Sequence, residues 1–346
     1  MERINKLLSV IKELECECAV ITDRANVRYL SGFTGSAGYL IISEKENLII
    51  TDFRYIEQAN IEAKGFEVIN VKDFNEKDYG NKFLSTAFEN ESVSYMEYLK
   101  IESNFKNLKP LNKALLKMRS IKDAKEIECI KKAEKIGDDA FSYIMSVIKP
   151  GMTELQVARE IDFYMLSHGA ERLSFETIVA SGPRGSMPHA TPSENVIKNG
   201  DLVVMDFGCV YKGYCSDMTR TVGIGNISDE LRKAYDTVYT AQLEALKKIK
   251  AGANCADIHN TAFNIIDEKY KGMFGHALGH GVGLEIHEQP TFAPKSDYEL
   301  NENVVISVEP GVYIPDLCGV RIEDLVLVTK DGYENLTNSP KELILI

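Results

Sequence analysis

At 346 residues the chain is longer than one ordinary hydrophobic core requires, which favours two domains. Its formal net charge of -12 argues against a nucleic-acid partner, because phosphate backbones bind basic surfaces. No stretch approaches the ~18 consecutive apolar residues of a membrane span, so no membrane partner is expected. Seven scattered cysteines without a C-x-x-C pair are typical of reduced thiols in a cytoplasmic protein.

The first part of the chain alternates helix-like and strand-like segments. The predicted elements are helices over 4–14 and 54–63 and strands over 18–22, 39–42, 48–51 and 66–69. This alternation is typical of a small α/β domain, which we place at residues 1–120.

The sequence pattern changes from short alternating segments to a long helical one near residue 120, which marks the start of a second domain, 121–346. Ser120 can cap a helix, and 122–147 combines helical spacing with dense charge. A long helix is therefore expected to link the domains. Further on, Thr153 and Gln156 form a capping box that starts another helix.

The second domain contains a weak internal repeat. Gly151 and Gly252 each precede a helix-like segment, and they are 101 positions apart. Asp206 and Glu309 each end an apolar strand-like run, and they are 103 positions apart. Two such similar offsets indicate two half-domains of one design, related by an approximate two-fold axis.

Four carboxylates occur at the ends of these strand-like runs. Asp206 is followed 11 positions later by Asp217, and Glu309 is followed 14 positions later by Glu323. A single aspartate after a strand is more often a turn residue, but the pair recurs in both halves. Buried carboxylates are costly unless they are paired or hold a cation. Together with His280, these residues have the donor types that hold two divalent metal ions.

Polar residues near these carboxylates suggest further roles. Thr219 shares a strand face with Asp217, so its hydroxyl is expected to orient a metal ligand. His189, His276 and His287 lie in segments rich in glycine or proline. Taken singly, each histidine would be interpreted as a loop residue. Beside two metal ions, however, imidazoles suit acid–base chemistry and oxyanion stabilisation.

These segments together resemble the metallopeptidase family that includes methionine aminopeptidase, aminopeptidase P and prolidase. The resemblance rests on six motifs, Met205–Gly208, Ser216–Thr221, Gly279–Gly283, His287–Pro290, Val308–Gly311 and Gly319–Asp324. It implies an α+β "pita-bread" catalytic domain with pseudo-two-fold symmetry. Segments 26–35 and 51–55 resemble the creatinase-like α/β N-terminal domain, which typical methionine aminopeptidases lack.

The resemblance also implies roles for individual residues. Two divalent metal ions would be held by Asp206, Asp217, His280, Glu309 and Glu323. The catalytic residues would be His189, His276, His287, Glu309 and Arg321. Manganese, cobalt and zinc are the metals of the family, and oxygen-rich ligation favours manganese.

The activity expected from this resemblance is removal of the N-terminal residue from peptides with proline at the second position. The bond before proline is a tertiary amide without an N–H, so peptidases that bind that N–H lose a contact. Glu309 would accept a proton from the attacking water, and His287 and His276 would stabilise the oxyanion.

Prolidase, which cleaves Xaa-Pro dipeptides, is the nearest alternative. It needs a cationic contact for the product carboxylate, and many prolidases carry a basic residue where this chain has Thr291. That difference favours an aminopeptidase, although Arg321 or an N-domain arginine could supply the contact. A non-catalytic interaction module on the same fold is a third hypothesis, which the complete ligand set disfavours.

The expected partners are a peptide substrate and a second copy of the chain in a homodimer. Four N-domain residues could reach the active-site mouth of a neighbouring subunit or could simply pack the domain surface. They are Arg28, Tyr29, Arg54 and Tyr55.

Overall fold

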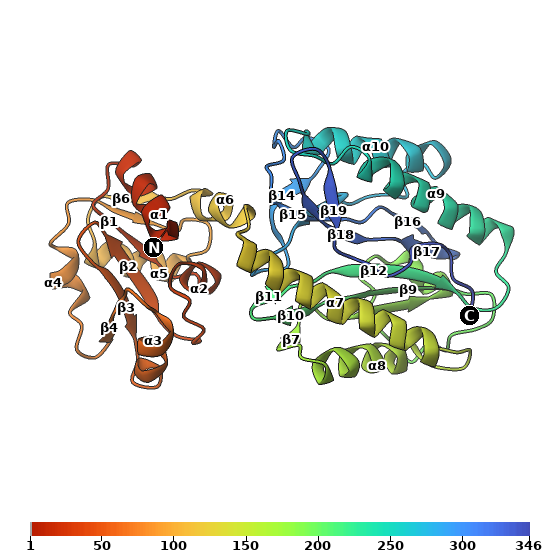
Figure 1. Ribbon diagram of the computed structural model, residues 1–346, viewed down its shortest axis with the longest axis horizontal. Coiled ribbons are helices and arrows are strands. Elements are labelled where there is room, and N and C mark those ends of the chain that lie inside the picture. The colour runs from red at the N-terminus through yellow and green to blue at the C-terminus, as the bar shows by residue number, and fades with distance from the viewer. Residues whose placement is uncertain (1) are drawn as a thin grey trace. The chain divides into compact units, whose positions relative to one another are not determined.

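The structure is a computed structural model that describes residues 2–346. It divides into two compact units, Met1–Arg119 and Ser120–Ile346, which are coloured red to orange and yellow to blue in Figure 1. Within residues 2–346, no helix combines the length and the apolarity that crossing a bilayer requires.

The first unit is an α/β domain around one sheet. Its elements are α1 (Glu2–Glu13), β1 (Cys18–Ile21), α2 (Arg24–Ser31), β2 (Tyr39–Ser43), β3 (Asn47–Thr51), α3 (Ile56–Glu62), β4 (Glu67–Asn70), α4 (Glu76–Gly80), β5 (Thr86–Phe88), α5 (Tyr95–Asn104), β6 (Leu108–Pro110) and α6 (Ala114–Ser120). The strand order is β4-β3-β2-β1-β5-β6, with antiparallel pairing among β1, β2 and β3 and parallel pairing elsewhere.

The predicted helices and strands of this unit are confirmed to within a few residues. The strands are short runs of β-branched and aliphatic residues, and Val20, Ile41 and Ile50 are buried in the core. Ile101 and Phe105, at the end of α5, belong to the same core. Burial of these strand residues is what drives the segments together.

The second unit begins with two helices and the strands that they cover. These elements are α7 (Ala124–Val147), α8 (Glu154–Ser167), β7 (Arg172–Leu173), β8 (Ile178–Ser181), the 3-10 helix η1 (Gly182–Ser186), β9 (Leu202–Phe207), β10 (Cys209–Tyr211), β11 (Tyr214–Cys215) and β12 (Met218–Gly223). The strands form two three-stranded sheets, β12-β9-β8 and β11-β10-β7.

The remainder of the second unit repeats that order. Its elements are α9 (Asp229–Leu246), α10 (Cys255–Lys269), β13 (Gly279–Gly281), β14 (Glu288–Phe292), β15 (Val305–Val308), β16 (Gly311–Ile314), β17 (Cys318–Arg321), β18 (Asp324–Val328) and β19 (Tyr333–Asn335). Five strands pair in the order β14-β13-β15-β18-β19, and β16 pairs with β17. Two helices followed by strands therefore occur twice, as the internal repeat predicted.

Each half has its own apolar core between helices and strands. In the first half, Phe141 of α7 and Ile161 of α8 share a core with Met205 of β9. In the second, residues of α9 and α10 share a core with Ile306 of β15 and Val326 of β18. Figure 1 shows α7 and α8 on one side of the strands and α9 and α10 on the other. This arrangement leaves the strand ends of both halves free to meet at the centre.

Helix starts follow local capping chemistry, with one prediction corrected. The capping box at Thr153 and Gln156 is confirmed, since each side chain accepts a hydrogen bond from the other residue's backbone N–H. The prediction that Ser120 caps the long helix is wrong, because Ser120 ends α6. Asp123 caps α7 instead. Its carboxylate accepts from the Glu126 backbone N–H, and the Glu126 carboxylate accepts from the Asp123 backbone N–H.

Candidate metal centre

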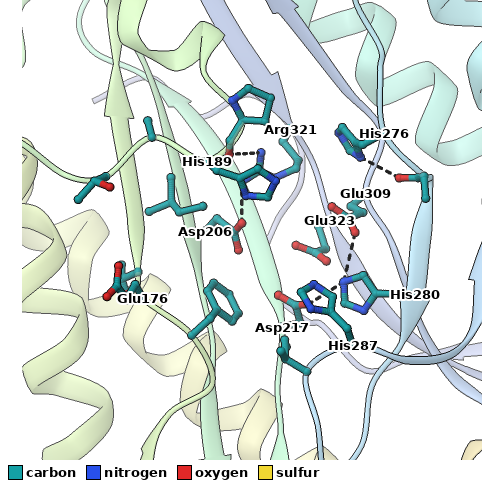
Figure 2. Close-up of a pocket in the computed structure, with 18 of the residues that line it drawn as sticks. Glu176, His189, Asp206, Asp217, His276, His280, His287, Glu309, Arg321 and Glu323 are labelled. Atoms are coloured by element: carbon teal, nitrogen blue, oxygen red, sulfur yellow. Dashed lines mark hydrogen bonds and ion pairs between the residues drawn. The ribbon is translucent and has the colours of Figure 1, made fainter. Parts of the chain in front are cut away.

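The five predicted metal ligands converge from strands of both halves of the second unit. Asp206 lies in β9, Asp217 directly precedes β12, His280 lies in β13, Glu309 follows β15 and Glu323 lies between β17 and β18. In the β9–β12 ladder Asp206 is opposite Thr219, so the side chains of Asp206, Thr219 and Asp217 belong to one face. Figure 2 shows the five side chains around one cavity.

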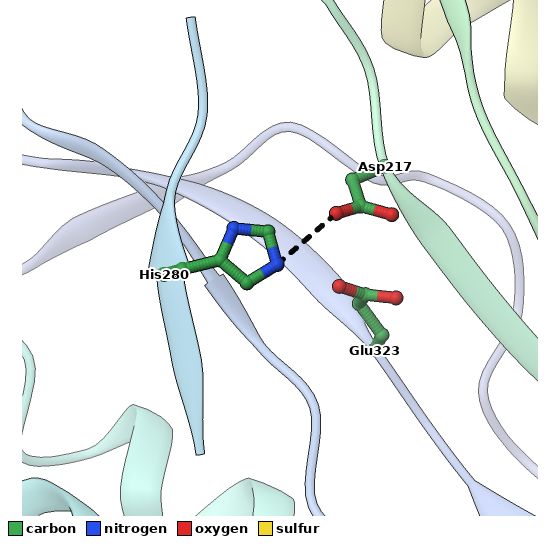
Figure 3. A group of neighbouring side chains, drawn as sticks. All are labelled: Asp217, His280 and Glu323. Atoms are coloured by element: carbon green, nitrogen blue, oxygen red, sulfur yellow. Dashed lines mark ion pairs between the residues drawn. The ribbon is translucent and has the colours of Figure 1, made fainter. Parts of the chain in front are cut away.

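Distances within the group are those of side chains that converge on one centre. Asp217, His280 and Glu323 each offer a donor atom within 4.8 Å of the others, as Figure 3 shows. His280 Nε2 is 3.6 Å from Asp217 Oδ2 and 3.4 Å from Glu309 Oε1. Asp206 adjoins this group and is held by Arg321, whose Nη2 donates to Asp206 Oδ2 at 2.6 Å.

The electrostatics of the group show that it is built for cations. Burial raises the pKa of Asp217 well above its usual range, and the charge of Glu323 raises it further. Burial likewise raises the pKa of Glu323, with Glu309 adding to the effect. Burial also raises the pKa of Glu309 to about 8. Three carboxylates that destabilise one another when ionised are stabilised together by a divalent ion.

Two further observations fit a metal centre. Asp206 Oδ1 is buried and has no hydrogen-bond partner among the described residues, which leaves one carboxylate oxygen available to a cation. Burial, helped by His287, lowers the pKa of His280 to about 4, so its imidazole is neutral near pH 7. The neutral imidazole is the form that binds metal. The residues present therefore fit divalent metal ions.

A layer of hydrogen bonds lies behind the ligands. The buried Thr219 hydroxyl donates to Glu323 Oε2 at 2.8 Å and accepts from Arg321 Nε at 3.1 Å. Thr219 therefore makes the contact that the prediction requires, a hydrogen bond to one of the candidate ligands. This layer joins the two halves, because Thr219 lies in β12 and both of its partners follow β16 in the chain.

Arg321 has all three guanidinium nitrogens engaged with the protein. Besides Thr219 and Asp206, its Nη1 donates to the Tyr313 hydroxyl at 2.9 Å and to the Pro188 carbonyl at 3.2 Å. The family resemblance implied a catalytic role for Arg321, and Arg321 does line the cavity. Its hydrogen bond to Asp206 also holds that carboxylate in position.

His276 is likewise engaged at both ring nitrogens. Its Nδ1 is 2.8 Å from the Ala277 carbonyl, which can only accept, so Nδ1 carries the proton. Its Nε2 is 2.9 Å from the Tyr313 hydroxyl and therefore accepts from it. Burial lowers the pKa of His276 to about 4, which keeps this neutral tautomer near pH 7.

The remaining predicted histidines face the cavity, whose volume is about 410 Å³. His189 and His287 make no hydrogen bond to any other residue within 2–346, so their rings are available to a substrate. Burial lowers the pKa of His287, which favours its neutral form. All nine predicted site residues line this one cavity.

The sequence analysis did not identify three residues at the site. Tyr313 lies in β16, where an aromatic residue looks like core, and only its hydroxyl contacts mark it as part of the site. Glu134 of α7 is buried beside Asp217, and its carboxylate accepts from the Asp217 backbone N–H at 3.3 Å. Glu176 lines the cavity from the segment before β8. No pattern in the sequence distinguishes these residues from others of their type.

Comparison with known proteins agrees with this geometry. Residues 128–330 match metallopeptidase family M24, and residues 3–121 match the creatinase/prolidase N-terminal domain. An uncharacterized peptidase, YqhT of Bacillus subtilis, is 42% identical, and the alignment covers 99% of this chain and 100% of that protein.

Two solved structures are also similar over nearly the whole chain. The Xaa-Pro dipeptidase from Bacillus anthracis has a TM-score of 0.96 at 41% identity, covering 100% of this chain and 99% of that one. The X-Pro aminopeptidase from Thermotoga maritima has a TM-score of 0.91 at 39% identity, covering 99% and 100%. The family suggested by the sequence motifs is thus confirmed, and the chain belongs to metallopeptidase family M24 as a metallopeptidase with a creatinase-type N-terminal domain.

Proposed function

We propose that the chain is an Xaa-Pro aminopeptidase, which releases the first residue from peptides that carry proline at the second position. The proposed ligands of its two divalent ions are Asp206, Asp217, His280, Glu309 and Glu323. When bound, the ions supply Lewis-acid polarisation of the scissile carbonyl and a lowered pKa for the attacking water.

The observation that carries the choice of an aminopeptidase is the engagement of Arg321. Of the residues between Ser120 and Ile346 that line the cavity, it is the only lysine or arginine, and all its nitrogens already donate to protein atoms. The neutral His276 adds no positive charge. A dipeptide presents a carboxylate directly after proline, and the one cation of this wall already uses four of its five N–H groups on protein atoms. A longer peptide presents a neutral amide at the same point.

The chain's own groups supply the proton transfers. The Glu309 carboxylate, which faces His280 at 3.4 Å, accepts a proton from the attacking water. It returns that proton to the prolyl nitrogen, which has no proton of its own and leaves as a secondary amine.

The three imidazoles have three different roles. His287 makes no hydrogen bond to other described residues, so its ring donates to the carbonyl oxygen as negative charge develops, a contact worth about 3 kcal/mol. His276 was expected to share this role, but the Tyr313 hydroxyl occupies its Nε2. We therefore assign His276 to holding Tyr313 against Arg321, and His189 to positioning the substrate.

An Xaa-Pro dipeptidase is the second candidate. It is favoured by the 41% identity to the B. anthracis protein of that name. It requires a cationic group beyond those of the cavity wall described here. Manganese, a homodimer and a cytoplasmic location stay predictions from the sequence.

The deciding experiment compares Ala-Pro with Ala-Pro-Ala as substrates of the manganese-loaded protein, with Ala-Ala-Ala as the control. We expect kcat/KM to be at least tenfold higher for Ala-Pro-Ala than for either other peptide. A tenfold preference for Ala-Pro would establish the dipeptidase instead. Equal turnover of Ala-Ala-Ala would remove the requirement for proline. Absence of any cleavage, with two metal ions bound per chain, would remove the function altogether.

A further inference from the structure

Glu176 contributes a carboxylate to the wall of the site cavity but belongs to neither the ligand group nor the hydrogen-bond layer behind it. Its side chain is exposed, and it lines the cavity together with Phe175 and Ile178. Within residues 2–346 it makes no hydrogen bond and no ion pair. A carboxylate that faces a substrate cavity without a partner is available to a cationic group of the substrate.

The strand register sets the position of Glu176 relative to the catalytic groups. Ile178 of β8 is directly opposite Asp206 of β9, so the two side chains share a face. Glu176 precedes Ile178 by two residues and stays on that side, about 7 Å further along an extended chain. In Figure 2 it lies on the far side of Asp206 from His280 and Glu309. Glu176 therefore lies beside the ligand group and not within it.

The composition of the wall fits a long side chain with a charged end. Phe175 and Ile178, which are close to Glu176 in the chain, provide apolar surface to the cavity wall. Lysine and arginine lay their aliphatic stems along such surface while the charged head stays in water. At this wall the head would meet Glu176.

The distribution of charge indicates which end of the peptide lies here. Asp206 lies between Glu176 and the other ligands His280 and Glu309 in Figure 2, so two carboxylates lie on this side of the cavity. An N-terminal residue brings the positive charge of its α-ammonium group, so it is attracted to the side formed by Asp206 and Glu176. The side chain next to Glu176 is then that of the first residue.

We propose that Glu176 selects peptides whose first residue is lysine or arginine, an inference that rests on the proposed function. The contact is an ion pair at a partly solvated wall. Exposed pairs of this kind change a binding constant by about threefold to fivefold and weaken as salt is added.

The test compares Lys-Pro-Ala with norleucine-Pro-Ala, because norleucine has the lysine stem without the ammonium group. With the manganese-loaded protein, we expect a kcat/KM ratio of about 3 to 5 in favour of lysine. Glu176→Gln should bring that ratio close to 1, and Glu176→Lys should bring it below 1. Addition of 1 M NaCl should also reduce it, since the Debye length is then about 3 Å.

Glu194→Gln is the matched control, because Glu194 is an exposed glutamate of the loop between η1 and β9 that does not line the cavity. It should leave the ratio at the wild-type value. A ratio that Glu176→Gln leaves unchanged overturns the inference and leaves the proposed function standing. An equal loss for both peptides would mean that Glu176 holds the α-ammonium group, which also overturns it. If the wild type cleaves neither tripeptide, the proposed function fails and this inference fails with it.

Discussion

Replacing Thr219 with valine removes one hydroxyl from behind the metal ligands while keeping the shape of the side chain. Thr219 is 0% exposed, and its hydroxyl links Glu323 at 2.8 Å to Arg321 at 3.1 Å. A hydrogen bond to a charged group is worth about 1.5–3 kcal/mol. Loss of the bond that orients Glu323 therefore predicts metal binding about 10- to 150-fold weaker, since 1.4 kcal/mol is tenfold. This range agrees with the cost usually found for groups that orient a metal ligand.

The same strand offers a matched control in Thr221. It is 1% exposed and also makes two hydrogen bonds with Arg321, but both are to backbone atoms, at 2.9 Å and 3.1 Å. Thr221→Val should lower the free energy of unfolding by about 1–3 kcal/mol without changing metal affinity. The two variants therefore separate an effect on the ligand from a general loss of stability.

The assay is calorimetric titration of manganese alone into the metal-free protein, with urea unfolding of each variant in parallel. Both variants should unfold at lower urea, and only Thr219→Val should bind manganese more weakly. If Thr219→Val binds manganese as tightly as the wild type, the hydroxyl does not orient Glu323. If both variants lose affinity equally, the effect comes from strand packing.

The remaining predictions concern the metal, pH and a buried ion pair. Asp206→Asn should retain less than one metal ion per chain by elemental analysis and lose activity; full occupancy with normal turnover would contradict its place among the ligands. Burial lowers the pKa of His276 from 6.5 to about 4, so the unfolded chain binds a proton in this interval that the folded site does not. Stability should therefore fall by up to about 3 kcal/mol as pH drops from 6.5 to 4, and His276→Gln should reduce this dependence in urea unfolding; an unchanged dependence would contradict the prediction. Lys122 and Glu288 form an ion pair with side chains 1% and 2% exposed. Lys122→Met should cost about 3–5 kcal/mol of unfolding free energy, and adding Glu288→Leu should restore most of it; no recovery would show that the loss comes from packing of the lysine stem.

The acids at strand ends were predictable because their position is costly. Asp206 and Glu309 each end an apolar run, and such a position is stable only if a partner holds the charge. Thr219 was predictable from the two-residue period of a strand, which puts it on the face of Asp217. The capping box at Thr153 depends on residues three apart. In each case the relevant physics acts over a few residues of chain.

The engagement of Arg321 and the roles of Tyr313, Glu134 and Glu176 could not be predicted in this way. Arg321 contacts Asp206 across 115 positions, and Glu134 contacts Asp217 across 83. Such pairs form only after the two halves pack, and the sequence carries no local signal of which polar side chain will face which. The error in the start of α7 has a smaller cause. Ser120 and Asp123 are both good caps, but only Asp123 has a glutamate, Glu126, three residues later to complete the capping box.

The sequence by itself determined the family, the helices and strands, and the identity of the candidate ligands, because each depends on residue type and short-range spacing. The tertiary structure decided which of those residues are free to meet a substrate. It showed that Arg321 and His276 are already engaged, that His287 and Glu176 are not, and that Thr219 braces Glu323. Hydrogen-bonding capacity is limited, and only the packed fold reveals where each donor and acceptor has been used.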